Sequence, residues 1–193
     1  MAEHNVYAKS ILSKKIRLSI VETGENVKEN IESKITSSVE GKCIAEGFIK
    51  PGSVRLVSYS SGIINNENIE FQTIFECMMC HPVEGMTMDC ISKTITKAGV
   101  HAQVIDSDGT IPVTVFIARD HHNMNRQFNS IKENANITIK VTGVRYELND
   151  PYICVLGKLT ENVKPKLKIG GNANLEMVVG GGVDSDDTDD DDE

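Results

Sequence analysis

Residues 105–118, with the sequence IDSDGTIPVTVFIA, indicate the fold of the second half of this chain. The pair Asp108-Gly109 is a favoured hairpin turn, and it separates two strand-like runs. Further strand-like runs lie on both sides of this stretch. They occupy residues 85–99, 100–106, 135–148 and 152–159.

The spacing of these runs points to one architecture. Gly99 separates the first two runs, Asn149-Asp150-Pro151 joins the last two, and the longest connection is the polar stretch 119–134 between the third and fourth. Five strands with the long connection in that place are typical of a five-stranded OB barrel. Such barrels often bind single-stranded nucleic acid, but the pattern also suits an inert barrel.

The first half of the chain mixes strands with a helix. Residues 14–21 alternate, with Ile16, Leu18 and Ile20 on one side, as in a half-buried strand. Residues 25–41 then place apolar side chains four apart and end at Gly41, which predicts an amphipathic helix. Three strand-like runs follow, at 43–50, 53–59 and 69–79. The prediction is an α+β domain with strand, helix and antiparallel meander.

The net negative charge of the chain comes from its last ten residues. The net charge is -8, and the segment DSDDTDDDDE (184–193) holds eight acidic residues, so the rest has 20 acidic and 20 basic residues. We therefore expect three parts: an N-terminal domain over 1–81, a barrel over 82–162, and a flexible linker with an acidic disordered tail over 163–193. The tail fits a nucleic-acid mimic or a solubilising segment equally well.

The chain shows no transmembrane or secretory pattern. It lacks an apolar run of eighteen residues, and its first ten residues lack a signal-peptide profile. We expect a protein that is not secreted and has no membrane partner, with its five cysteines as free thiols.

The string FECMMCHP (75–82) resembles a metal or haem motif. Cys-x-x-Cys-His attaches c-type haem, and Cys-x-x-Cys is half of many zinc sites. Haem attachment is disfavoured without an export signal. Cys77 and Cys80 should point to opposite faces of a strand, which disfavours zinc. We expect no metal and no cofactor, with the cysteines filling apolar positions.

Other short motifs carry little chemistry. Adjacent histidines in Arg119-Asp120-His121-His122 are expected to be solvated, and the segment at Asp106 is read as a hairpin turn rather than a calcium loop. No phosphate loop or catalytic constellation stands out, so we expect no catalytic residues.

Basic and aromatic residues on the expected barrel strands are candidates for RNA contacts. They could follow a phosphate backbone and stack bases, although an ordinary solvated face fits the pattern as well. The residues are Lys93, Lys97, His101, Arg119, Lys140, Arg145, Tyr146, Tyr152 and Lys158.

Several segments in order resemble one known family. They are VEGKC (39–43), GFI (47–49), SGII (61–64), residues 75–104, VTVFIARDHH (113–122) and residues 137–159. Over residues 7–160 the chain resembles the larger stalk subunit of archaeal and eukaryotic-type RNA polymerases, the seventh subunit of RNA polymerase II and E prime in archaea. The resemblance leaves the polymerase class open, and with it a cellular or a viral origin.

This resemblance implies a function. It implies a non-catalytic subunit of DNA-directed RNA polymerase, with a truncated ribonucleoprotein-type domain docked at the clamp base of the core. It also implies a smaller helical partner subunit, nascent RNA as a ligand of the barrel, and a place in the nucleus, the cytoplasm or, for a viral protein, the virion. The alternative is a free-standing single-stranded RNA-binding protein in translation or RNA decay.

The resemblance also assigns roles by position. The docking tip would comprise Gly47, Phe48, Ile49, Gly62, Ile63 and Ile64, and the interdomain hinge would comprise His81, Pro82 and Gly85.

Overall fold

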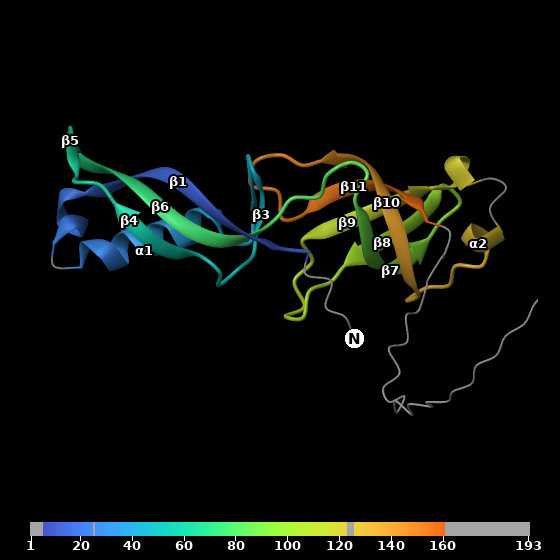
Figure 1. Cartoon of the computed structure of the whole chain (residues 1–193). Helices are drawn as coiled ribbons and strands as arrows, with labels where there is room; N and C mark the ends of the chain where they lie inside the picture. The colour runs from blue at the N-terminus through green and yellow to red at the C-terminus, as the bar shows by residue number, and fades with distance from the viewer. Residues whose placement is uncertain (1–5, 25, 123–125, 161–193) are drawn as a thin grey trace, which may run out of the picture. The chain divides into compact units, whose positions relative to one another are not determined.

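A computed structural model describes residues 6–24, 26–122 and 126–160 of the chain. These residues form a six-stranded sheet followed by a closed five-stranded barrel (Figure 1). An α+β arrangement followed by a barrel is what the sequence predicted. The linker and acidic tail predicted over 163–193 lie outside the described residues.

The N-terminal sheet is organised around its longest strand, β6 (Asn68–Cys80). β1 (Ala8–Ser19) pairs antiparallel with almost the whole length of β6. Along its other edge, β6 pairs in turn with three short strands, and the last of these also pairs with β2. The three are β5 (Ile63–Asn65), β4 (Arg55–Tyr59) and β3 (Gly47–Ile49), and β2 spans Cys43–Ile44.

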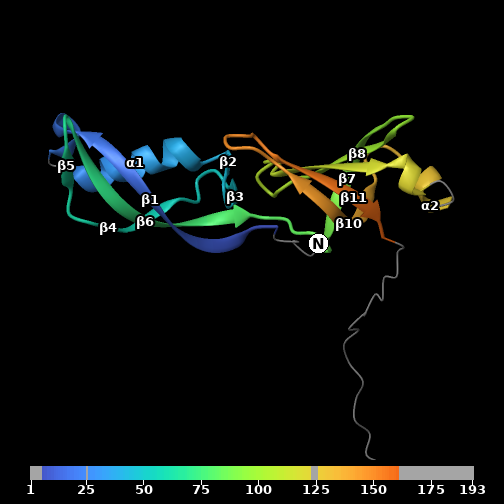
Figure 2. The same cartoon turned by 90° about the horizontal axis from the view of Figure 1, so that it is seen from above.

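Helix α1 (Val27–Val39) covers one face of this sheet (Figures 1 and 2). The predicted apolar stripe is confirmed, since Ile31, Ile35 and Val39 are fully buried against the sheet. Helix and sheet therefore share one hydrophobic core. Gly41, with a φ of 67°, turns the chain just after the helix.

Ile20 corrects the strand prediction. It was expected to continue the buried side of Ile16 and Leu18, but β1 ends at Ser19 and Ile20 is 60% exposed. The 3₁₀ helix η1 (Ile20–Thr23) begins there, because Ser19 and Glu22 form a capping box that ends the extended chain.

The barrel closes in the order β10-β11-β9-β8-β7, and only β9 and β11 are parallel. This is the strand arrangement of an OB barrel, which confirms the prediction. The longest connection, between β9 and β10, holds η2 (Arg119–His122) and α2 (Arg126–Asn129). The strands are β7 (Thr87–Ile95), β8 (Gly99–Val104), β9 (Val113–Ala118), β10 (Asn136–Arg145) and β11 (Ile153–Leu159).

Two hydrophobic clusters fill the protein, and one of them joins both halves. The cluster inside the barrel includes Tyr7, Cys43, Phe48 and Cys80, all from the N-terminal half. The other cluster lies between α1 and the N-terminal sheet. The division of the chain at residues 81 and 82 into separately folding domains stays a prediction.

Among the residues that the structure describes, no helix has the length and apolar character needed to span a bilayer.

Candidate functional site

An aromatic and apolar row crosses the outer face of the barrel. His101 on β8 lies opposite Phe116 on β9, which lies opposite Leu156 on β11. The His101 and Phe116 rings are 4.8 Å apart between centroids, at an interplanar angle of 44°. Leu156 is 54% exposed. We call His101, Phe116 and Leu156 the barrel row; it offers flat apolar surface on which bases can stack.

The barrel row continues onto a glycine. Leu156 lies opposite Gly143 on β10, where a β-bulge shifts the register. A Cβ at Gly143 would be in ordinary van der Waals contact with Leu156 side-chain atoms at 3.7 Å, so the glycine lies directly beside the leucine.

Two lysines flank this row. Lys140 on β10 and Lys158 on β11 lie directly opposite each other, and both are exposed. Within the described ranges, no carboxylate lies within ion-pair distance of either ammonium group. Like charges opposed across two strands are destabilising. The pair is therefore a natural place for an external anion such as a phosphate.

Other predicted RNA contacts surround the row less closely. Lys93 lies in a β-bulge next to Thr94, the cross-strand neighbour of His101. Arg145, opposite Cys154, is 3.5 Å from Glu147 in an exposed ion pair. Tyr152 is 42% exposed. Lys97 is exposed in the turn after β7.

Arg119 and Tyr146 have structural contacts. The Arg119 guanidinium donates to the carbonyl oxygens of Lys97 at 2.9 Å and Thr96 at 3.2 Å, and it lies 5.3 Å from the centroid of the Phe128 ring. The Tyr146 hydroxyl donates to the Ala45 carbonyl oxygen at 3.1 Å. These contacts hold loops in place, so we leave both residues out of the proposed RNA surface.

Phe116 and Leu156 are the site residues that the sequence reasoning missed. The signal was present, because Val113, Val115 and Ile117 alternate with outward positions and place Phe116 on the outer face. Phe116 was not predicted as a contact because it is uncharged and lies within an apolar run.

His122 is buried, which corrects the expectation that both histidines are solvated. Its ring stacks on Phe128 with centroids 5.0 Å apart. The Leu159 amide donates to Nε2 at 3.0 Å, so Nδ1, 2.8 Å from the Ala118 carbonyl oxygen, carries the proton and donates. His122 thus ties the end of β11 to the end of β9, while His121 is exposed.

The predicted docking residues fall into two separate places. Gly47–Ile49 form β3 and are buried, and Ile49 pairs with Met79 near the end of β6. Ile64 pairs with Ile69 near the start of β6. Ten residues of strand separate Ile69 from Met79, roughly 33 Å. The structure therefore does not bring the two segments together, and only Gly62, Ile63 and Ile64 are exposed.

The exposed segment lies at the same end of the sheet as two other exposed apolar side chains. Asn68 pairs with both Ser19 and Asn65, so η1 and β5 lie at the same end of the sheet (Figure 1). Four side chains there are mostly exposed, and we call them the apolar tip. They are Ile20 (60%), Val21 (91%), Ile63 (69%) and Ile64 (75%).

The predicted hinge connects β6 to β7. Pro82 is buried, His81 is exposed, and Gly85 adopts a φ of 86°, which favours glycine. The Gly85 amide donates to the Val141 carbonyl oxygen at 2.8 Å. The connection is therefore attached to the barrel; its role as a hinge stays a prediction.

The cysteines of the string FECMMCHP (75–82) lie in different cores. Cys77 packs in the cluster under α1, and Cys80 packs in the cluster inside the barrel. The predicted opposite orientation is confirmed. Burial raises the pKa of the Cys80 thiol to about 12, so this thiol stays protonated at neutral pH. Within the described residues, no group of three or more potential metal ligands converges.

Comparison with known proteins supports the family resemblance. The chain is 22% identical to a protein of Acanthamoeba polyphaga mimivirus that is named as a DNA-directed RNA polymerase subunit. The alignment covers 95% of this chain and 97% of the viral protein. It is 25% identical to DNA-directed RNA polymerase II subunit 7 of Arabidopsis thaliana, over 64% of this chain and 76% of that protein.

A third relative has the same kind of name. The chain is 21% identical to a seventh subunit of DNA-directed RNA polymerase II from Glycine max, over 72% of this chain and 85% of the relative. No protein-family model matches the chain. The chain is thus similar to seventh subunits of RNA polymerase II and to a viral relative, as the resemblance predicted.

Proposed function

We propose that this chain is a non-catalytic subunit of a multisubunit DNA-directed RNA polymerase. The observation that carries the proposal is the similarity to polymerase subunits in two plants and a virus, in one case over nearly the whole chain. The combination of an α+β sheet and an OB barrel supports it. The N-terminal sheet docks to the polymerase core near the clamp base, and the barrel contacts nascent single-stranded RNA. A smaller helical subunit is a further proposed partner.

The apolar tip is the proposed docking surface. Its four side chains are mostly exposed although each is large and apolar. Exposed apolar side chains that gather at one place mark protein interaction sites. Ile64 lies across from Ile69 on β6, so the register of the sheet positions this part of the tip.

Affinity purification tests the docking proposal. A tagged chain carrying both Ile63→Asp and Ile64→Asp is expressed in the organism that makes it, and polymerase subunits that co-purify are measured by mass spectrometry. We expect at least a tenfold loss of polymerase, because a buried unpaired carboxylate is costly at an interface. Leu148→Asp, at a side chain that is 68% exposed in the barrel half, is the matched control. Retention of polymerase by the double variant would contradict tip docking.

The barrel row with Lys140 and Lys158 is the proposed RNA surface. Bases stack on the row, and phosphates lie against the two lysines. Stacking a base on an aromatic side chain contributes roughly 1–3 kcal/mol, and each phosphate contact adds salt dependence. The strand pairing of the row and of the two lysines supports this proposal.

Photo-crosslinking of nascent RNA in the transcribing polymerase tests this surface. Phe116→Ala and the double variant Lys140→Ala/Lys158→Ala should each reduce crosslinking to the chain severalfold, with polymerase association unchanged. The double variant Lys28→Ala/Lys34→Ala, at two exposed positions of α1, is the charge-matched control. Equal crosslinking in all variants would place the RNA elsewhere.

The second candidate function is a free-standing single-stranded RNA-binding protein, which the barrel row alone would support. Binding of a labelled oligouridine to the purified chain distinguishes the two. We expect weak binding without polymerase. Tight binding that is lost in Phe116→Ala, together with no polymerase in the purification, would favour the second function.

The proposed function also sets the proposed location. A subunit of a nuclear polymerase resides in the nucleus, and a subunit of a viral polymerase is made in the host cytoplasm and packaged in the virion. Immunofluorescence and virion proteomics separate these cases.

A further inference from the structure

The turn between β8 and β9 presents two carboxylates in a fixed geometry. Asp106 Oδ1 accepts a hydrogen bond from the Ser107 amide at 2.6 Å, and the Asp106 amide donates to the Thr110 carbonyl oxygen at 2.9 Å. Gly109, with a φ of 81°, allows the chain to return. Oδ1 of Asp106 thus shapes the turn, which leaves Oδ2 for another partner.

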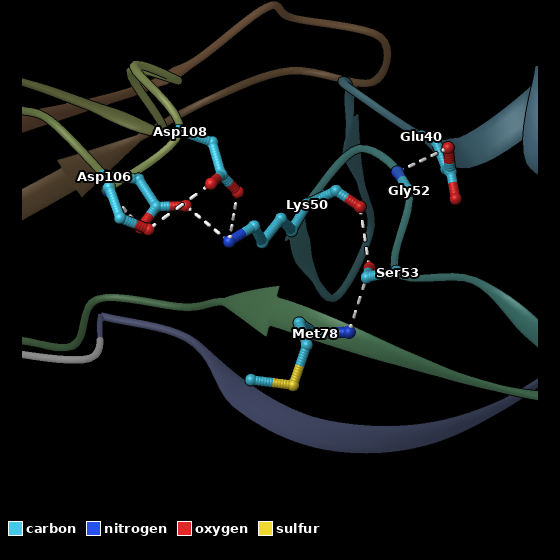
Figure 3. A network of polar contacts seen from close by, with 8 residues as sticks. Glu40, Lys50, Gly52, Ser53, Met78, Asp106 and Asp108 are labelled. Carbon is cyan, nitrogen blue, oxygen red and sulfur yellow. Dashed lines mark hydrogen bonds and ion pairs between the residues drawn. The ribbon is translucent and has the colours of Figure 1, made fainter.

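That partner is Lys50, which comes from the other half of the chain. Its Nζ lies 2.7 Å from Asp106 Oδ2 and 2.8 Å from Asp108 Oδ2, as Figure 3 shows. The same Nζ is 5.3 Å from the centroid of the Tyr7 ring. The side chains of Lys50 and Asp106 are only 22% and 15% exposed. One ammonium group therefore pairs with two carboxylates, one of which is largely enclosed.

The main chain of Lys50 is held on the N-terminal sheet. Its amide donates to the Met78 carbonyl oxygen at 2.9 Å, and its carbonyl oxygen accepts from the Ser53 hydroxyl at 2.6 Å. Ser53 Oγ in turn accepts from the Met78 amide at 3.1 Å (Figure 3). Because the backbone is tied to β6 and the side chain to the barrel, Lys50 links the two.

A second barrel loop holds the hairpin that β2 and β3 form. The Cys43 amide donates to the Asp150 carbonyl oxygen at 2.8 Å, and the Asn149 amide donates back to the Cys43 carbonyl oxygen at 2.8 Å. Both bonds cross from one half of the chain to the other. We call the contact between the β2–β3 hairpin and the barrel loops the joint. Exchange of these two amides with solvent therefore reports directly on opening of the joint.

The charge of Lys50 stabilises the ionised form of Asp106. Burial alone would raise the pKa of Asp106, but contact with Lys50 and the Ser107 amide outweighs burial and lowers it. Without the ammonium group, two carboxylates in one turn would repel each other, and one of them would be largely buried without a counter-charge.

We propose that Lys50, Asp106 and Asp108 form a joint latch, which holds the N-terminal sheet and the barrel in one orientation. Neutralising Lys50 frees the β8–β9 turn and makes opening of the joint more frequent, while the cluster under α1 stays packed. The latch concerns this chain alone and does not depend on polymerase or RNA binding. A protein that docks by one half and binds a ligand by the other needs such a fixed joint to place the ligand.

Amide hydrogen exchange on the full chain tests the latch. In Lys50→Met, which keeps the length of the side chain, exchange at Cys43 and Asn149 should be at least tenfold faster, because charge-assisted hydrogen bonds are lost. Amides of Ile31 and Ile35 in α1 should be unchanged. The matched control is Lys9→Met, which removes an ion pair of 2.9 Å to Glu76 inside the N-terminal sheet. This control should leave the exchange at Cys43 and Asn149 as it is.

A milder variant covers the case in which Lys50→Met does not fold. Asp108 is 63% exposed, so Asp108→Asn removes one negative charge from the latch and should speed exchange at Cys43 and Asn149 by about threefold. Unchanged exchange at both amides in either folded variant overturns the latch. So does a uniform increase that includes α1, because it would mean general destabilisation rather than opening of the joint.

Discussion

The shared core predicts that a substitution in the N-terminal half will destabilise the barrel. Phe48 is 1% exposed and packs in the cluster inside the barrel, although it lies on β3. Burying a phenylalanine removes roughly 150 Å² or more of apolar surface from water, about 4 kcal/mol at 25 cal/mol per Å². Measured Phe→Ala losses in cores are about 3–5 kcal/mol. We therefore expect Phe48→Ala to lower the free energy of unfolding by about 3–4 kcal/mol.

Native-state hydrogen exchange under increasing denaturant measures where this loss appears. The amide of Val115 on β9 reports on the barrel, and the amide of Ile35 reports on α1. Phe48→Ala should lower the stability seen at Val115 by the full amount. Phe75→Ala is the matched comparison, because Phe75 is equally buried but packs only in the cluster under α1. If Phe48→Ala lowers the stability at Ile35 and leaves Val115 unchanged, the reasoning from a shared core is wrong.

Three further predictions follow from single side chains. The pKa of Asp106 lies below its ordinary value of 3.8, so the latch contributes its full stability above that pH and loses it as the pH falls through the lowered pKa. Exchange at Cys43 should accelerate in that pH range. Exchange at the joint that does not depend on pH, after correction for intrinsic rates, would contradict this. Iodoacetamide should alkylate only Cys154 in the native chain, because the other four cysteines are buried, and a second adduct in the mass spectrum before unfolding would contradict this. His122→Ala should cost about 2 kcal/mol, since the Leu159 amide loses its partner and Phe128 its stacked ring, whereas a loss near zero in chemical denaturation would contradict that role.

Local patterns in the sequence determined the secondary structure of both halves. The period of four residues in α1, the alternation along β9 and the turn signals at Asp108-Gly109 and Gly99 depend on neighbours in the chain, so they could be read without a structure. Five strands with the longest connection after the third were enough to predict an OB barrel. Ile20 was misread because a capping box, not hydrophobic alternation, decided where β1 ended.

Part of the candidate site could be predicted in the same way. Lys140, Lys158 and His101 were predicted from alternating strand positions. The structure places the two lysines opposite each other, and β9 separates the strand of His101 from that of Lys158. Phe116 was missed because an outward aromatic residue within an apolar run looks like core until the neighbouring strands are known. The docking segments could not be separated by sequence, because only the pairing along β6 shows how far apart they lie.

The joint is the feature that only the tertiary structure decided. The sequence determined a turn at Asp106 and a basic residue at Lys50, but they are 56 positions apart and nothing local relates them. Closing the barrel brings its β8–β9 turn to the β2–β3 hairpin, where a single ammonium group meets two carboxylates. Long-range contacts of this kind depend on the packing of whole sheets, so the shared core and the ion-paired joint could not be predicted from local sequence patterns.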